Sequence, residues 1–143
     1  MRFWDTSAIV PLIVREPSST ACRHEHRVEP QQTVSRITRL EATDALYRKL
    51  REGVIASGEL RMSLRALDML ASRWSVIELT EEVDDDACAL VARHPLRAAD
   101  AVQLAAARVA TGGHPRSHAF LTRDEVLSRA AAAEGFRVIV PKR

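Results

Sequence analysis

Residues 119–141, AFLTRDEVLSRAAAAEGFRVIVP, combine a strand pattern, a helix pattern and a second strand pattern. The short apolar run 119–122 and the β-branched run 137–141 are typical of strands. Residues 123–135 between them have a helical composition, and Gly135 is placed to end that helix. Strands that alternate with helices indicate an α/β fold with a mostly parallel sheet covered on both faces.

The same alternation extends back to the start of the chain. Ser35 is placed to cap the helix 36–53, Gly53 to end it, and Thr80 to cap a helix with an acidic first turn; Thr6 or Ser7 is placed to cap the first helix. The remaining expected strands are 2–4, 33–35 and 75–79, and the remaining expected helices are 6–16, 18–29, 58–74, one after Thr80, and 96–110.

The composition is that of one globular domain over residues 1–143, with 46% hydrophobic and 28% charged residues. A net charge of +2 permits nucleic-acid binding without arguing strongly for it. Cys22 and Cys88 lack motif spacing, so buried free thiols in a reducing compartment are expected. No signal peptide and no apolar run of about 20 residues is evident, so a cytoplasmic location is expected.

Asp100 lies in the alanine-rich stretch 96–110, LRAADAVQLAAARVA, which predicts a nearly apolar helix. Side chains four apart share a row on a helix, so Asp100 would lie between Leu96 and Leu104. A lone buried carboxylate costs several kcal/mol unless something compensates it. The sequence therefore requires a partner for Asp100.

Three further acids occupy comparable positions. Asp5 directly follows the first strand, Asp124 follows the strand 119–122, and Glu41 lies on a helix row with Ile37 and Ala45. Open α/β sheets bind ligands at the carboxyl ends of their strands. Four carboxylates without evident basic partners suggest a hard divalent cation such as Mg²⁺ or Mn²⁺, which prefers oxygen ligands.

Each acid also has a purely structural explanation. Asp5 could start a helix, Asp124 could cap one, and Glu41 could pair with Arg36 or Arg39. Arg97, Arg108 and Arg123 could contact phosphates or could simply be solvated, and the same solvated role is expected for His94, His114 and His118.

Several catalytic patterns are absent from the chain. It has no HExxH, no glycine-rich phosphate loop and no nucleophile elbow. The stretch DTSAIV at residues 5–10 lacks the second Asp of the DxD phosphotransferase motif, which argues against an aspartyl-phosphate enzyme.

Four stretches in order carry a resemblance to a known family: FWDTSAIVPL, SRITRLEATDAL, LRAADAVQLAAA and AFLTRDEVLSRAAAAEGFRVI. Together they span nearly the whole chain, and the sequence resembles the PIN-domain ribonucleases, specifically the VapC-type toxins of type II toxin–antitoxin systems. The resemblance implies a three-layer α/β/α sandwich and cleavage of RNA. It also implies that Asp5, Glu41, Asp100 and Asp124 converge on Mg²⁺ or Mn²⁺.

In that family pattern, Thr6 or Ser7 matches the small hydroxyl residue that helps to orient a metal-bound water. The resemblance further implies a cognate antitoxin and a homodimer, with residues 54–75 contributing to one of these contacts. A homodimer is also favoured by the apolar stretches 8–14 and 66–71, which a small sheet would not fully cover.

Two other functions remain open at this point. The chain could be a non-catalytic PIN-like domain that binds RNA or acts as a scaffold, although the complete set of four acids argues against that role. It could also be a Mg²⁺-dependent phosphohydrolase built on a similar sheet.

Overall fold

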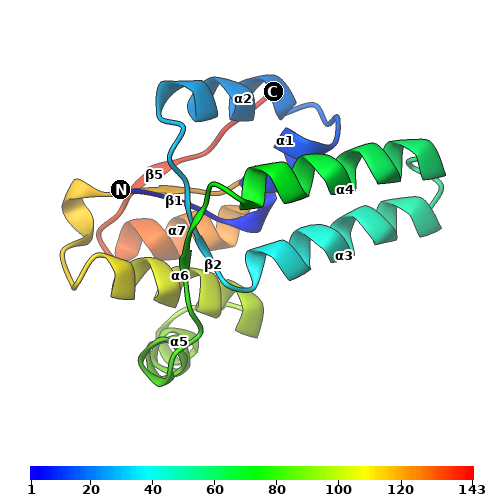
Figure 1. The fold of residues 1–143 in the computed structure, drawn as a ribbon. Helices are drawn as coiled ribbons and strands as arrows, with labels where there is room; N and C mark the ends of the chain where they lie inside the picture. The colour runs from blue at the N-terminus through cyan, green and yellow to red at the C-terminus, as the bar shows by residue number, and fades with distance from the viewer.

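Five short strands form a single sheet at the centre of the protein (Figure 1), in the order β3-β2-β1-β4-β5, with every neighbouring pair parallel. The computed structural model describes all residues, 1–143. The strands are β1 (Arg2–Trp4), β2 (Thr33–Ser35), β3 (Ser75–Ile77), β4 (Ala119–Leu121) and β5 (Arg137–Ile139). The expected α/β fold with a parallel sheet is confirmed.

Seven helices surround this sheet. They are α1 (Thr6–Ile13), α2 (Ser19–Val28), α3 (Thr38–Arg51), α4 (Ser57–Ala71), α5 (Glu81–Arg93), α6 (Ala98–Ala110) and α7 (Glu125–Ala133). None of these helices combines the length and the hydropathy that a membrane span requires.

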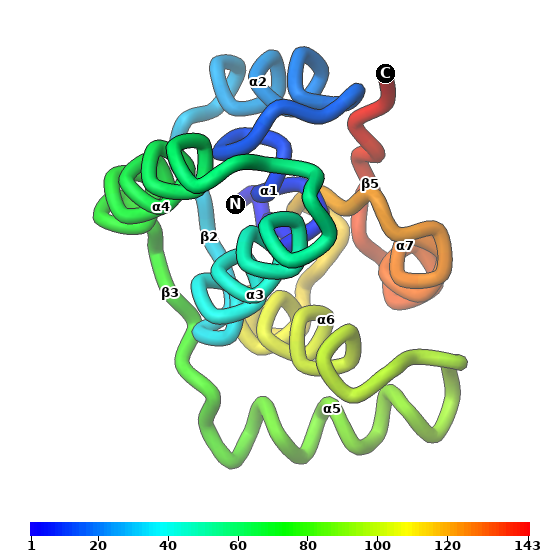
Figure 2. Tube along the Cα trace, turned by 90° about the vertical axis from the view of Figure 1, so that its right-hand side faces the viewer, coloured from blue at the N-terminus to red at the C-terminus, as the bar shows by residue number.

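Alternation along the central strands divides the core into layers. Phe3 and Phe120 stack with ring centroids 5.3 Å apart and pack against α5, α6 and α7. Trp4 and Leu121, the next residue of each strand, point to the opposite face and pack with α1. Figure 2 shows α5, α6 and α7 on one side of the strands and α1, α2 and α4 on the other. This arrangement is the expected α/β/α sandwich.

The helix starts differ from several sequence-based expectations. Asp5, rather than Thr6 or Ser7, is the N-cap of α1. Ser35 accepts a hydrogen bond from the Ile37 amide but ends a strand, and α3 begins at Thr38. The predicted caps and stops elsewhere are confirmed: Thr80 caps α5, and Gly53 and Gly135 follow helices with φ of 72° and 102°.

The residue at which α6 begins changes the expected surroundings of Asp100. The helix begins at Ala98, so Leu96 lies outside it and the predicted row of Leu96, Asp100 and Leu104 does not form as expected. Asp100 instead lies in the first turn of α6. Free backbone N–H groups and the helix dipole favour a negative charge there.

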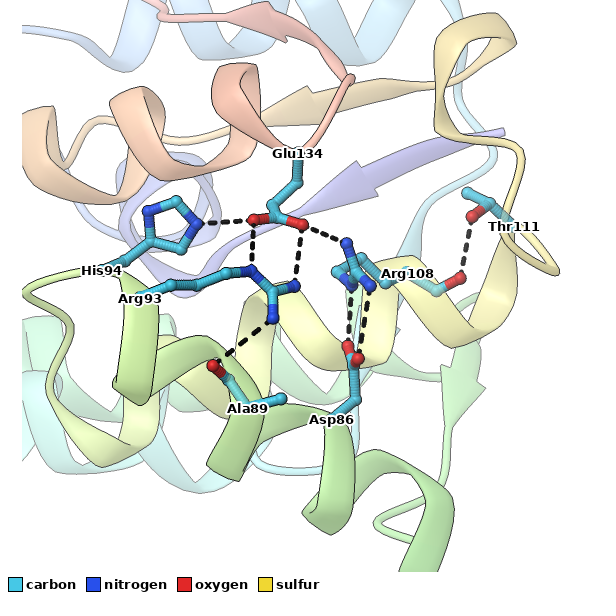
Figure 3. Close-up of polar contacts among 7 residues, drawn as sticks. All are labelled: Asp86, Ala89, Arg93, His94, Arg108, Thr111 and Glu134. Carbon is cyan, nitrogen blue, oxygen red and sulfur yellow. Dashed lines mark hydrogen bonds and ion pairs between the residues drawn. The ribbon is translucent and has the colours of Figure 1, made fainter.

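An ion-pair cluster of Asp86, Arg93, His94, Arg108 and Glu134 joins α5, α6 and the end of α7 (Figure 3). Arg93 donates to both Glu134 oxygens at 3.0 and 2.9 Å, and Arg108 bridges Glu134 to Asp86. The expectation of a solvated His94 is wrong, because its Nε2 lies 2.6 Å from Glu134 Oε2. Arg108 is likewise occupied here and is not available to a phosphate.

Glu134→Gln should lower the free energy of unfolding at pH 7 by roughly 1–3 kcal/mol, because it removes a charged acceptor shared by several donors. The hydrogen bond from Arg93, then that from His94 and the Arg108 charge, lowers the pKa of Glu134 to about 2 despite its burial. This contribution should therefore be complete above about pH 5 and vanish as the pH falls toward 2.

Urea unfolding at several pH values measures the effect of this substitution. Glu78→Gln is the matched control, because Glu78 pairs with Arg36 on the exposed surface and should contribute less. Equal losses in the two variants, or a loss for Glu134→Gln that is unchanged at pH 2, would contradict the role of the cluster.

Candidate functional site

Four acids gather at the end of the sheet where the strands finish and helices start. Asp5 follows β1 and caps α1; Asp124 follows the neighbouring strand β4 and caps α7, accepting from the Leu127 amide at 2.8 Å. Glu41 and Asp100 lie in the first turns of α3 and α6. Each acid is thus placed at a helix N-terminus, where a negative charge is favoured. Asp5 and Asp124 do cap helices, and both also belong to this group of four acids.

Hydroxyl groups fix the Asp5 carboxylate. The Ser7 hydroxyl donates to Asp5 Oδ2 at 2.6 Å, and the Thr122 hydroxyl donates to the same oxygen at 2.9 Å. Thr122 Oγ1 in turn accepts from the Asp124 amide at 3.0 Å, which links the ends of β1 and β4. Burial raises the pKa of Asp5 to about 6; these hydrogen bonds oppose the rise, and the Glu41 charge adds to it.

A second set of polar side chains fixes Glu41. Its Oε1 accepts from the Thr6 hydroxyl at 2.8 Å and from Gln103 Nε2 at 2.7 Å. The same Gln103 nitrogen reaches the hydroxyl oxygens of Thr6 and Thr38 at 2.9 and 3.0 Å, so its two protons are shared among three acceptors. Two segments far apart in the chain, the start of α1 and the middle of α6, therefore hold one glutamate.

The proposed pairing of Glu41 with a nearby arginine is wrong. Arg36 pairs with Glu78, and Arg39 lies 3.4 Å from Asp68. None of the four acids takes part in an ion pair with arginine, lysine or histidine, although many other acids of the chain do.

Asp100 is half-buried and electrostatically coupled to its neighbours. Burial raises the pKa of its carboxyl group, and the charges of Asp124 and Glu41 raise it further, while Arg97 opposes the rise. With the effect of Glu41 on Asp5, this coupling connects all four acids. We call Asp5, Glu41, Asp100 and Asp124 the acid quartet.

The donor chemistry of the acid quartet fits a hard divalent cation. All four side chains offer carboxylate oxygens, and none of them forms an ion pair with a cationic side chain of the protein. No group of three or more aspartate, glutamate, histidine or cysteine side chains lies close enough together here to hold one ion. Mg²⁺ is commonly bound through one or two carboxylates together with waters and phosphates, and this set meets that requirement.

The sequence reasoning missed Gln103, Thr38 and Thr122 as parts of this site. Gln103 is completely buried and lies three residues after Asp100, so both side chains occupy neighbouring positions on α6. It is the only other polar residue between Ala98 and Ala107, and that isolation was the available signal. Thr122 lies two residues before Asp124, and this T-x-D spacing is visible in the sequence at residues 122–124.

The arginine predictions have different outcomes. Arg123 lies beside the site, since its backbone amide donates to the Ser7 hydroxyl at 2.8 Å. Arg97 is exposed and caps α6. A hollow of about 660 Å³ lies away from the acid quartet, between α5 and α6, and Arg108 and Glu134 are among its lining residues.

Comparison with known proteins identifies the family. The model of the PIN domain family matches residues 2–133, so this chain belongs to that family, whose members are generally nucleases. The resemblance expected from the sequence is confirmed. No curated protein sequence gives a significant match.

Several solved structures share the fold. A toxin–antitoxin complex from Klebsiella pneumoniae is 18% identical, with 100% of this chain and 99% of that chain covered and a TM-score of 0.71. VapBC2 from Rickettsia felis, bound to a DNA fragment from its promoter, is 12% identical, with 97% of each chain covered and a TM-score of 0.69. FitAB bound to the IR36 DNA fragment is 19% identical, with coverages of 99% and 95% and a TM-score of 0.69.

Asp100→Asn should raise the melting temperature in EDTA at pH 8. The folded pKa of Asp100 lies above its ordinary value, so ionisation of this carboxyl group costs stability at high pH. The gain should shrink as the pH falls and disappear below about pH 4, where the carboxyl group is protonated in both states.

Thermal unfolding followed by circular dichroism measures this gain. Asp85→Asn is the control, because Asp85 is exposed on α5 and forms no ion pair. If Asp100→Asn melts below the original chain at pH 8, hydrogen bonds to the carboxylate outweigh the repulsion, and the coupling within the acid quartet is refuted.

Gln103→Met should lower the free energy of unfolding by roughly 1–3 kcal/mol, because it leaves buried acceptors without their shared donor. Gln103→Glu should be least stable at pH 8 and recover partly at pH 5, since it places a second carboxyl group beside Glu41. Urea unfolding at both pH values checks this; two variants as stable as the original chain would exclude a positioning role for Gln103.

Proposed function

We propose that this chain, acting as one domain over residues 1–143, is a metal-dependent endoribonuclease and the toxin of a toxin–antitoxin pair. The observation that carries the proposal is the acid quartet, in which four coupled carboxylates without a cationic partner lie at one end of the sheet. Membership of the PIN domain family supports a nuclease.

Asp5, Glu41, Asp100 and Asp124 are the proposed ligands, directly or through waters, of Mg²⁺, for which Mn²⁺ would substitute. A bound ion would lower the pKa of a water molecule and neutralise carboxylates that otherwise repel a phosphodiester. The protein's part is to hold these oxygens in place: Ser7 and Thr122 orient Asp5, while Thr6 and Gln103 orient Glu41.

Burial raises the pKa of Asp5 to about 6 in the metal-free protein, and a bound cation would favour the ionised carboxylate and lower this pKa. Thr6 and Ser7 have separate proposed roles: Ser7 fixes the oxygen of Asp5, and Thr6 fixes Glu41 across the site.

The proposed partners are a cognate antitoxin and a second copy of the chain. The Klebsiella pneumoniae structure is a toxin–antitoxin complex, which favours such a partner here. The expectation that the apolar stretch 8–14 remains uncovered is wrong, because Ile9, Val10 and Ile13 are buried. Exposed apolar side chains lie instead on α3 and α4: Leu40, Met62 and Met69 are 71%, 72% and 72% exposed.

This α3–α4 face includes part of residues 54–75, so we propose it as the contact with one of the two partners. Leu40 and Tyr47 lie seven residues apart on α3, as do Met62 and Met69 on α4, so each pair marks one face of its helix. A toxin that cleaves RNA would act in the cytoplasm.

The purified chain should cleave mixed RNA in the presence of MnCl₂ and should be inactive in EDTA. Asp5→Asn should reduce cleavage at least ~100-fold, whereas the exposed control Asp85→Asn should keep full activity. Expression of the original chain should arrest bacterial growth, and Asp5→Asn should relieve that arrest at equal protein level.

Other outcomes would favour the alternatives. Binding of RNA without metal and without cleavage would indicate a scaffolding domain, and hydrolysis of a generic phosphomonoester but not of RNA would indicate a phosphohydrolase. Asp5→Asn that is as active and toxic as the original chain would reject Asp5 as a ligand.

A further inference from the structure

A polar hollow lies where α1 passes into α2. Its volume is about 450 Å³, which is within the range of small-ligand sites of roughly 300–1,000 Å³. No apolar side chain of the core contributes to it. The lining residues are Arg15, Glu16, Pro17, Ser19, Thr20 and Arg23.

Two arginines of this hollow have no partner in the protein. Arg15 and Arg23 are exposed, and neither forms an ion pair or a side-chain hydrogen bond. Both also line an adjoining hollow of about 290 Å³ on α1. Arg36, Arg48 and Arg129 show the contrast, since each pairs with a carboxylate on the surface. The guanidinium groups of Arg15 and Arg23 are therefore free to bind an external anion.

The one carboxylate in the hollow is neutralised from two sides. Glu16 Oε1 lies 2.9 Å from Lys49 Nζ, and Glu16 Oε2 lies 3.8 Å from an Arg123 nitrogen. The Glu16 amide donates to Ser19 Oγ at 2.8 Å, which fixes the turn between the helices. With Arg15 and Arg23 in the lining and Glu16 neutralised by Lys49 and Arg123, the hollow has a net positive charge.

The hollow adjoins the acid quartet through Arg123. Its backbone amide donates to Ser7 Oγ, which donates to Asp5, while its side chain reaches Glu16. Its Nε also donates to the Pro141 carbonyl at 3.3 Å, and Lys142 and Arg143 follow directly. Figures 1 and 2 both show the end of the chain beside the start of α2. More positive charge therefore lies at the same edge.

The buried thiol of Cys22 supports this grouping without being reactive itself. Burial raises its pKa to about 11, while the charges of Arg123 and Arg23 lower it and that of Glu16 raises it. The charges of Arg123, Arg23 and Glu16 thus all act on the one buried thiol of α2. Protonated Cys22 offers no nucleophile near neutral pH.

We propose that this hollow is a subsite for a backbone phosphate of the nucleic-acid strand whose scissile phosphodiester lies at the acid quartet. The inference rests on the proposed function. A site made of carboxylates repels a polyanion, so cations beside it must hold the strand. Arginine suits this task because its planar fork matches a phosphate, and Arg15 and Arg23 have no competing carboxylate.

Binding of a fluorescent single-stranded RNA in EDTA, titrated with KCl, tests the subsite apart from catalysis. Arg15→Gln and Arg23→Gln should each reduce the slope of log affinity against log salt by about 0.7, since each removes one phosphate contact to a single strand. Arg61→Gln and Arg65→Gln are matched controls, because both residues are exposed and unpaired on α4. They should leave the slope unchanged.

Glu16→Gln provides a test with the opposite sign. It removes the only carboxylate of the hollow and releases Lys49 and Arg123, so RNA should bind severalfold more tightly. A variant that is merely misfolded would bind less tightly. Circular dichroism melts of all variants accompany the binding data.

Kinetics and competing ligands complete the test. Arg15→Gln/Arg23→Gln should raise KM for RNA severalfold with kcat unchanged. If the hollow holds the strand backbone, the salt slope for a single-stranded DNA of the same sequence should fall by the same amount in the arginine variants. If millimolar inorganic phosphate competes and the slope falls for neither strand, the hollow binds free phosphate and the proposal is overturned.

The subsite and the proposed function can fail separately. If the original chain cleaves RNA but the arginine variants match the controls in slope and KM, the subsite is rejected and the nuclease stands. If the original chain binds RNA with the arginine-dependent slope but cleaves none, the subsite stands and the nuclease is rejected. No RNA binding by the original chain overturns the subsite.

Discussion

Repulsion among four carboxylates is the constraint on which the rest of the site depends. Neighbouring negative charges in a partly buried site repel one another, so a fold that groups four acids needs compensation. The protein supplies helix N-termini for all four and donor side chains for Asp5 and Glu41. The remaining strain is evident as the raised pKa values of Asp5 and Asp100, and a divalent cation is the ligand that would relieve it.

The parallel sheet is what brings these acids together. In a parallel sheet every strand ends at the same edge, so the residue after β1 and the loop after β4 become neighbours although 115 residues separate Ser7 from Thr122. Gln103 then extends the connection to α6 and α3. The ion-pair cluster at Glu134 joins α5 to the last turns of α6 and α7.

The helices and strands of this fold were predictable from local patterns. Apolar runs such as RFW and AFL indicate strands, and the glycines at 53 and 135 mark helix ends, and each of these signals lies within a few residues of the chain. The grouping of the acids was expected from their positions after strands and on apolar helix rows and from the family resemblance. The partners of Glu41, Glu134 and Arg108 were not predictable, since each pair joins segments that are 22 to 62 residues apart. The helix row drawn through Asp100 failed for a smaller reason: the helix begins two residues later than the apolar pattern does.

Charge at this edge of the molecule is arranged in two adjoining regions of opposite sign. Asp124 belongs to the acid quartet, and the side chain of Arg123, the residue before it, reaches Glu16 in the hollow at the α1–α2 junction. Glu16 lies 2.9 Å from Lys49 and 3.8 Å from Arg123, so two cations outside the acid quartet neutralise its charge. The acid quartet and the hollow therefore carry opposite charge side by side, which is the arrangement that the proposed metal site and the proposed phosphate subsite require.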